Sequence, residues 1–253
     1  MAEEKTVQSI SRVFTIIEVL AAHPAGVPLQ QLANEAGLAK STAHRLVANL
    51  CALGYAVQDS FSSHYRLTLK MFELSSAVVN DTSILSVAKP HLDRLARRSG
   101  EAVHLVIRDG EDVVYLFKAE SGGMRMSSRV GLRAPICCTG VGKAILSTLP
   151  YPEVEAIWRA TPHEKLTRHT ITDFDQLQEQ LALVRASGYA VDDEENELGI
   201  RCVAVPIPGP GGKAESAFSI SSLVPHMRRE RILQLAQLAL ETKENILRDL
   251  GLL

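Results

Sequence analysis

The sequence of 253 residues has few cysteines, no long apolar run and almost no net charge. Its four cysteines, Cys51, Cys137, Cys138 and Cys202, lack the paired spacing of a disulfide framework or a zinc site, so we expect reduced thiols and assign no metal. No apolar stretch reaches the ~20 residues that cross a bilayer, and the N-terminus lacks a signal-peptide pattern. These absences predict a cytoplasmic protein that does not enter a membrane.

The sequence also lacks an excess of positive or of negative charge. The 27 Lys and Arg are balanced by 29 Asp and Glu, which gives a formal net charge of −2. This balance excludes a protein that coats nucleic acid by bulk electrostatics, because such binding requires many neutralised phosphates. Hydrophobic residues make up 46% of the chain, enough to bury the core of one large domain or two small ones. Any contact with nucleic acid is therefore expected to be local.

Residues 1–66 have the pattern of a winged helix-turn-helix. Helical spacing of apolar residues predicts one helix over 9–23, a second from Pro28 to Gly37, and a third from Lys40 to Gly54. Two β-prone runs, 55–58 and 64–67, follow and predict a hairpin that forms the wing. In such units the helix after the turn enters the major groove of DNA.

The third predicted helix opens with side chains that suit DNA. Small hydrogen-bonding groups reach base edges there, and cations contact phosphates. The candidates are Arg12, Lys40, Ser41, Thr42, His44, Arg45 and Arg66. Each alone is equally compatible with a capping residue or a solvated charge, but turn, helix and wing occur in the expected order. Cations exceed anions by only two over 12–70, so we expect binding to need more than one copy of the chain.

A linker helix is predicted over 67–82 and a second domain over 83–253. The linker has one apolar seam, formed by Leu67, Met71, Leu74 and Val78, which would pack on another surface such as a second copy. Pro90 predicts a kink or a restart in the next helix. Strands that pair antiparallel, with helices to one side, then predict an α+β domain, so the chain is a two-domain α/β protein.

The stretch from Thr139 to Lys143 opens a helix, whose unpaired amides form a common anion cradle; a plain helix start is equally compatible. It is not a phosphate-binding Walker motif, because Cys137 and Ala144 stand where that motif requires Gly and Ser or Thr. In the predicted strand 217–222, Ser219 and Ser221 share one face. With Cys202 on a neighbouring strand they would line a small polar pocket; the alternative is a solvated strand face.

The acidic run 192–197 is interpreted as a solvated loop, since it lacks the spaced ligands and central glycine of an EF-hand. An enzyme with Cys202 as nucleophile, a small-molecule hydrolase or transferase, is the alternative function. No histidine lies beside Cys202 in sequence, and this alternative leaves the first 75 residues without a purpose.

The chain resembles the IclR family of bacterial transcription regulators over essentially its whole length. The resemblance rests on Leu38–Leu46 in the helix-turn-helix, on the wing end Tyr65–Leu67, and on the more specific motif Glu194–Pro206. It implies a winged helix-turn-helix, a GAF-like effector-binding domain, and dimers or tetramers on palindromic operator DNA. A small carboxylate metabolite would act as the switch, without a cofactor and without catalysis.

By position, the family's effector contacts fall on Gly140, Val141, Asp192, Cys202, Ser219 and Ser221. His104, Met124 and Arg125 are further candidates for tuning the ligand. Segments 67–74 and 128–131 are most similar to the branch that represses pectin and sugar-acid catabolism, whose effector is a 2-keto-3-deoxy sugar acid. The resemblance thus implies a repressor of a catabolic operon that responds to a keto acid or sugar acid.

Overall fold

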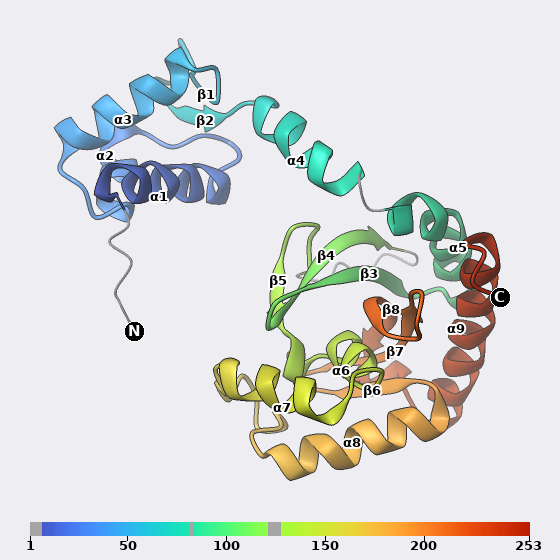
Figure 1. The fold of residues 1–253 in the computed structure, drawn as a ribbon. Helices are drawn as coiled ribbons and strands as arrows, with labels where there is room; N and C mark the ends of the chain where they lie inside the picture. Colours follow the sequence, from blue (N-terminus) through green and yellow to red (C-terminus); the bar gives the residue numbers. More distant parts are fainter. Residues whose placement is uncertain (1–6, 81–82, 121–127) are drawn as a thin grey trace. The chain divides into compact units, whose positions relative to one another are not determined.

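A computed structural model describes residues 7–80, 83–120 and 128–253 (Figure 1). The chain divides into two compact units, residues 1–81 and 82–253. Within the described ranges, no helix has both the length and the apolar character needed to cross a membrane.

The first unit is a winged helix-turn-helix. It contains α1 (Gln8–Ala22), α2 (Leu29–Glu35), α3 (Lys40–Ala52), the antiparallel hairpin β1 (Ala56–Gln58) and β2 (Tyr65–Leu67), and α4 (Lys70–Asn80). One apolar cluster joins the three helices to the hairpin, with Ile16, Leu32 and Val47 fully buried. Val27 exchanges two backbone hydrogen bonds with Tyr65, so the chain before α2 is held against the wing.

Both helices of the helix-turn-helix end at a glycine. Gly37 has φ +63°, and after it the amide of Leu38 donates to the carbonyl of Ala33 at 2.9 Å. Gly54 has φ +80°, and the amide of Tyr55 donates to the carbonyl of Leu50 at 2.8 Å. These hydrogen bonds, each to the carbonyl five residues earlier, pair carbonyls that a helix end leaves unpaired. Glycine adopts such positive φ values without strain, because it has no Cβ. These hydrogen bonds set the short turn between α2 and α3 and the exit into the wing.

The linker helix begins later than the apolar seam predicts. Leu67 is the last residue of β2, and α4 starts at Lys70. Of the predicted seam, Leu67 and Met71 are half-buried and Leu74 is 55% exposed. Leu69, just before α4, and Phe72 in its first turn are 79% and 69% exposed, so the start of the linker carries uncovered apolar side chains.

The second unit is built on a six-stranded antiparallel sheet in the order β5-β4-β3-β8-β7-β6. The strands are β3 (Ala102–Asp109), β4 (Asp112–Ala119), β5 (Arg133–Pro135), β6 (Ala190–Asp193), β7 (Ile200–Pro208) and β8 (Ala214–Leu223). The fold class predicted from the sequence, a winged unit followed by a GAF-like antiparallel α+β domain, is confirmed.

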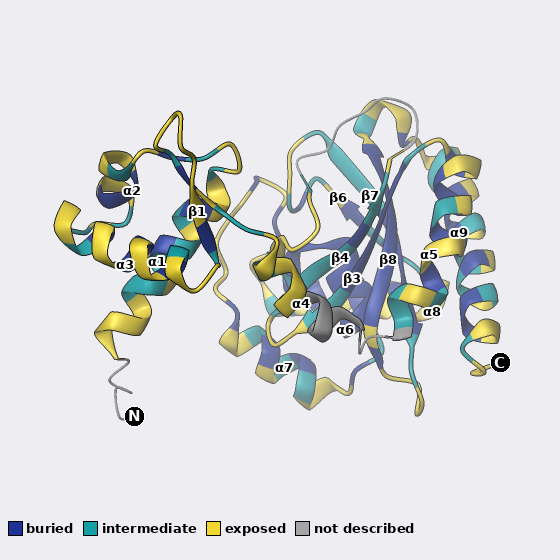
Figure 2. Cartoon of the chain, turned by 90° about the horizontal axis from the view of Figure 1, so that it is seen from above, coloured by how far each residue is buried: buried dark blue, intermediate teal, exposed yellow. Residues whose placement is uncertain are grey.

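Helices cover both faces of this sheet, which corrects the expected one-sided arrangement (Figures 1 and 2). One face packs on α5 (Ser83–Ser99) and α9 (Arg229–Asp249). The other packs on the short helix η1 (Ile136–Cys138), α6 (Gly140–Leu146), α7 (Tyr151–Ala160) and α8 (Phe174–Ser187). The strands are apolar on both sides: Phe218 and Ile220 face the first layer, whereas Ala217 faces the second.

Two further details go beyond the sequence interpretation. Of the kink or restart predicted at Pro90, the restart is absent: α5 runs through Pro90, because its buried stripe of Ala88, Leu92 and Leu95 packs on the sheet and offsets one lost backbone hydrogen bond. The helix α7 and the short strands β5 and β6 had no counterpart among the predicted elements.

Candidate functional site

Five of the seven predicted DNA contacts lie on α3. Ala43, Leu46, Val47 and Leu50 are buried in the core of the first unit, so the opposite face of the helix points to solvent (Figure 2). Lys40, Ser41, His44 and Arg45 are exposed there, and Thr42 is half-buried. The helix therefore presents small polar groups and cations along one side, as groove recognition requires.

The wing adds an exposed cation and an aromatic tip. Arg66 is exposed on β2, and Arg12 is half-buried on α1. The Asp59 carboxylate accepts hydrogen bonds from the amides of Phe61 and Ser62, and these bonds hold its pKa below the usual value. They shape a tip on which Phe61 is 99% exposed, a residue the sequence interpretation did not include.

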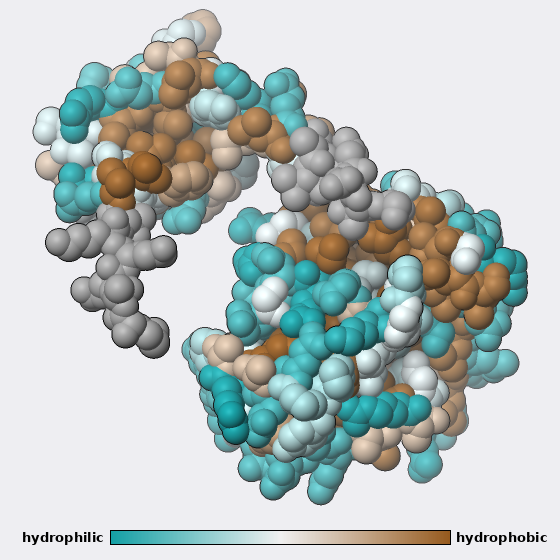
Figure 3. All heavy atoms as spheres, viewed as in Figure 1, coloured by the Kyte–Doolittle hydropathy of each residue, from teal (hydrophilic) through white to brown (hydrophobic). Residues whose placement is uncertain are grey.

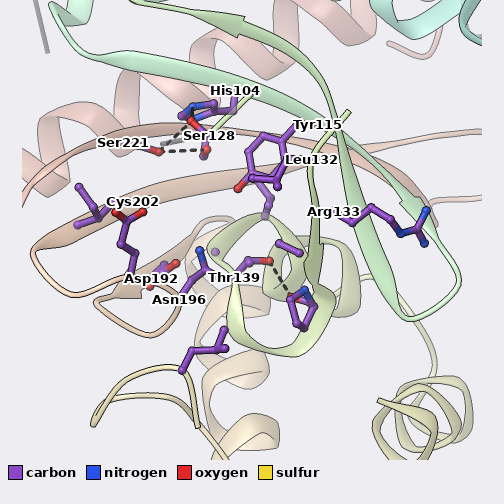
Figure 4. Close-up of a pocket in the computed structure, with 18 residues that line it drawn as sticks. His104, Tyr115, Ser128, Leu132, Arg133, Thr139, Asp192, Asn196, Cys202 and Ser221 are labelled. Carbon is purple, nitrogen blue, oxygen red and sulfur yellow. Dashed lines mark hydrogen bonds between the residues drawn. The ribbon is translucent and has the colours of Figure 1, made fainter. Parts of the chain in front are cut away.

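A cavity of about 250 Å³ in the second unit is lined by all six predicted effector contacts (Figure 4). They are Gly140, Val141, Asp192, Cys202, Ser219 and Ser221. The volume lies just below the roughly 300–1,000 Å³ of drug-sized ligand pockets. The pocket thus suits a metabolite of few atoms.

Strand register explains how one wall of the pocket is assembled. Asp192 on β6 lies opposite Cys202 on β7, and Cys202 lies opposite Ser221 on β8. Ser219 lies opposite His104 on β3. Since neighbouring residues across strands point to the same face, four strands contribute polar side chains to one surface. Ser219 and Ser221 are only 5% and 1% exposed, so this is not a solvated strand face.

His104 ties the polar wall together. Its Nε2 lies 2.8 Å from the Ser128 hydroxyl and its Nδ1 lies 3.3 Å from the Ser221 hydroxyl, which is 3.4 Å from that of Ser219. Burial lowers the pKa of His104 to about 4, so the imidazole is neutral at physiological pH. Tyr115 packs edge-on against the ring. Neutral hydrogen-bonding groups thus dominate this end of the pocket.

The opposite wall is the first turn of α6. The Thr139 hydroxyl accepts a hydrogen bond from the Gly142 amide at 3.1 Å, and the Lys143 amide donates to the Thr139 carbonyl. The amides of Gly140 and Val141 lie in the first turn of the helix, where no carbonyl of the same helix can accept their hydrogen bonds. A Cβ on Gly140 would lie 3.2 Å from the Cβ of Asp192, so glycine lets α6 approach the sheet closely.

The acidic run is only partly the solvated loop predicted from the sequence: Asp193 and Glu197 are exposed, but two of its carboxyl groups are buried. Asp192 ends β6 and is 5% exposed, and Glu195 is 6% exposed. Burial, reinforced by Glu195, raises the pKa of Asp192 to about 7, although Lys143 opposes the shift. Lys143 is itself fully buried and pairs with Glu195, which the sequence could not indicate because 52 residues separate them.

The structure disfavours Cys202 as a nucleophile. Burial raises the pKa of its thiol, and the nearby Asp192 raises it further, so the reactive thiolate is suppressed. The Cys138 pKa is likewise raised by burial, to about 12. All four cysteines are free thiols, and the described residues contain no cluster that could hold a metal ion.

Several other residues also line the pocket. His104 had been a candidate, whereas Met124 and Arg125 lie outside the described residues. The lining residues that the sequence interpretation did not include among the effector contacts are, among others, Tyr115, Ser128, Leu132, Leu166, Asn196 and Glu197. They come from segments whose approach depends on the tertiary fold. Arg133, at the rim of the pocket (Figure 4), donates hydrogen bonds from its guanidinium to the carboxylates of Asp109 and Asp112.

A winged helix-turn-helix joined to a sheet domain that contains a cavity is the architecture of a DNA-binding regulator. The chain belongs to the IclR family: residues 9–60 match the IclR helix-turn-helix domain and residues 76–248 match "Bacterial transcriptional regulator IclR C-terminal". This membership places the chain among transcription regulators and not among enzymes.

Named relatives agree with this membership. The DNA-binding transcriptional repressor YiaJ of Escherichia coli K12 is 35% identical over 99% of this chain and 92% of its own length. The HTH-type transcriptional regulator KdgR of the same strain is 33% identical over 90% of this chain and 86% of its own. The crystal structure of Thermotoga maritima IclR superposes with a TM-score of 0.84 at 31% identity, covering 97% of this chain and 100% of that one.

Proposed function

We propose that the protein is a metabolite-responsive repressor of a catabolic operon. It binds a palindromic double-stranded operator through Arg12, Lys40, Ser41, Thr42, His44, Arg45 and Arg66, and it binds a small carboxylate effector in the pocket of the second unit. The single observation that supports this function most is the convergence of six effector candidates, distant in sequence, on one cavity.

The pocket chemistry favours a keto acid or a sugar acid. The Gly140 and Val141 amides suit a carboxylate or keto oxygen, because unpaired helix amides bind anions. The serine hydroxyls and the neutral His104 both donate and accept hydrogen bonds, which suits ligand hydroxyls. The similarity of segments 67–74 and 128–131 to the sugar-acid branch of the family adds support for a sugar acid.

We propose that the working form is a homodimer or tetramer. The exposed apolar residues of the first unit include Ile10 and Phe14 on α1 as well as Leu69, Phe72 and Leu74, and apolar side chains are visible on its surface in Figure 3. Covering such side chains with a second copy is favourable and pairs two recognition helices. Effector binding would then change the spacing of the two helices and so the affinity for DNA.

A thermal-shift panel tests the function. Pyruvate, D-gluconate, D-galacturonate and a 2-keto-3-deoxy sugar acid are each added to the full chain, and a ligand that binds the native state raises Tm. The acid with the largest shift is then added to the complex of the protein with its own upstream intergenic DNA, and we expect release of the DNA. If no acid raises Tm and no flanking promoter is bound at low salt, the proposal fails.

A further inference from the structure

A buried ion pair lies directly behind the pocket. The Lys143 ammonium group donates to the Glu195 carboxylate and, at 2.6 Å, to the backbone carbonyl of Val191. Lys143 is 0% exposed and lies on α6, whose first turn forms one wall of the pocket. Lys143 therefore links that wall to the end of β6, where Asp192 is located.

Glu195 is in turn joined to Asp192. Its amide donates to the Asp192 carboxylate at 2.8 Å, so the backbone that carries one acidic side chain orients the other. The Thr170 hydroxyl donates to the Glu195 carbonyl and the Thr167 hydroxyl to the Glu194 carbonyl, each at 2.7 Å. The turn is thus held from two sides, and Lys143 is its charged anchor.

Stability alone does not explain this pair. Burying two charges costs several kcal/mol in desolvation, and well-packed apolar residues of similar volume are often equally stable or more so. Moreover, the Glu195 Oε2 atom is buried without a hydrogen-bond partner among the described residues. An ion pair retained at this cost, one hydrogen bond away from a pocket carboxyl, points to a role in the pocket.

We propose that Lys143 and Glu195 are positioning residues of the effector pocket: the pair fixes the Asp192 carboxyl and governs whether it accepts a hydrogen bond from the effector or donates one to it. This inference rests on the proposed effector function of the pocket. A protonated carboxyl donates to a ligand oxygen, whereas a carboxylate only accepts and repels a ligand anion. The ion pair would therefore help to select the ligand and couple its binding to one proton.

The charged and titratable groups that face Asp192 determine whether its carboxyl group is ionised. They are Lys143 from α6, Glu195 and Glu197 from the following turn, Cys138 from η1, Cys202 from β7 and Tyr115 from β4. The pKa values of both thiols and of the phenol are raised by burial, so these three stay neutral near pH 7. Lys143 and Glu195 thus supply the buried charges near Asp192: Glu195 raises the pKa of Asp192, and Lys143 lowers it.

The test measures Asp192 ionisation in the ligand-free full chain. The Tm difference between Asp192→Asn and its parent is followed from pH 5 to pH 8.5. We expect the Asn variant to gain Tm relative to the parent as pH rises, and the gain to level off near pH 7, where Asp192 of the folded parent has ionised. In a Glu195→Gln background, which keeps the shape and a hydrogen bond to Lys143, the gain should level off ~1 pH unit lower, because a like charge has been removed.

Asp193→Asn is the matched control. Asp193 is the neighbour of Asp192 on β6, but it is exposed and pairs with Arg201, so its removal should leave the pH at which the gain levels off unchanged. A gain that levels off at the same pH in Glu195→Gln as in the parent background overturns the proposal. The proposal is also overturned if the Tm shift given by the strongest acid of the panel has the same pH profile in Glu195→Gln and in the parent. A panel without a responding acid would count against the proposed function alone, because the first titration needs no ligand.

Discussion

His104 on β3 and Ser221 on β8 are joined by a hydrogen bond of 3.3 Å between Nδ1 and Oγ, although 117 residues separate them in sequence. The chain of bonds continues to Ser128 on one side and Ser219 on the other. A neutral imidazole donates through one nitrogen and accepts through the other, so the direction of the whole chain is coupled. A ligand that donates to one serine therefore constrains what the other can offer.

Ser219→Ala is expected to weaken effector binding by about 1–2 kcal/mol, roughly five- to thirtyfold, because one pocket hydroxyl and its bond to Ser221 are lost. The measurement is the Tm shift given by the strongest acid of the panel. The control is Ser222→Ala on the same strand: Ser222 is fully buried, and its hydroxyl has no partner among the described residues. Equal shifts in the two variants would remove Ser219 from the proposed site.

His104→Gln should change how stability depends on pH. In the unfolded chain His104 binds a proton near pH 6.5, whereas the folded chain keeps it neutral to about pH 4. Unfolding is therefore favoured as pH falls through this window, and the parent should lose about 3 kcal/mol relative to the variant between pH 7 and pH 4. Urea unfolding at several pH values measures the difference.

Asp192 has the opposite sign: its raised pKa means that stability falls as pH rises from about 4 to about 7. The parent alone would therefore show a shallow profile, and a flat difference between His104→Gln and the parent would contradict the neutral buried imidazole.

Local patterns predicted the polar face of β8 but not its neighbours. Alternation along 217–222 was sufficient to put Ser219 and Ser221 on one side. Asp192, Cys202 and Ser221 lie side by side only because their strands pair, although they are far apart in sequence. A short edge strand such as β6, with four residues, gives little periodic signal in the sequence. The site was thus predictable as separate pieces, and the resemblance to a family connected them.

The acidic run shows a second limit of sequence interpretation. Adjacent carboxylates usually face water, because burying one without a partner is costly. The partner here is Lys143 on α6, which the sequence interpretation treated only as part of a glycine-rich helix start. The close approach of α6 to the sheet, which brings Lys143 there, depends on glycines whose role is visible only in three dimensions.

Arg45→Ala is expected to weaken operator binding about tenfold and to reduce the salt dependence of binding, since Arg45 is an exposed cation on the recognition face of α3. Fluorescence anisotropy with the upstream intergenic DNA at several salt concentrations measures both effects. Arg159→Ala, which removes a 74% exposed arginine side chain of the second unit, is the control. The same affinity and salt slope in both variants would exclude Arg45 from the interface.

Gly142→Ala tests the packing that places α6 under the pocket. Alanine in a helix is intrinsically favoured over glycine by about 1 kcal/mol, so propensity alone predicts a more stable protein. In the structure, however, a Cβ on Gly142 would lie 1.8 Å from the carbonyl oxygen of Ile136. We expect the overlap to dominate and to destabilise the second unit by more than about 3 kcal/mol.

Urea unfolding of the full chain measures this loss, and Gly140→Ala is the matched comparison on the same helix. Its Cβ would meet the Asp192 Cβ at 3.2 Å and the Ala204 Cβ at 3.5 Å, a tight contact without overlap. Gly140→Ala should therefore fold with a loss of about 1 kcal/mol, while the added methyl group pushes α6 from Asp192 and reduces the effector-induced Tm shift. If Gly142→Ala is as stable as the parent, the approach of α6 to the Ile136 carbonyl is wrong, and with it the geometry assigned to this wall of the pocket.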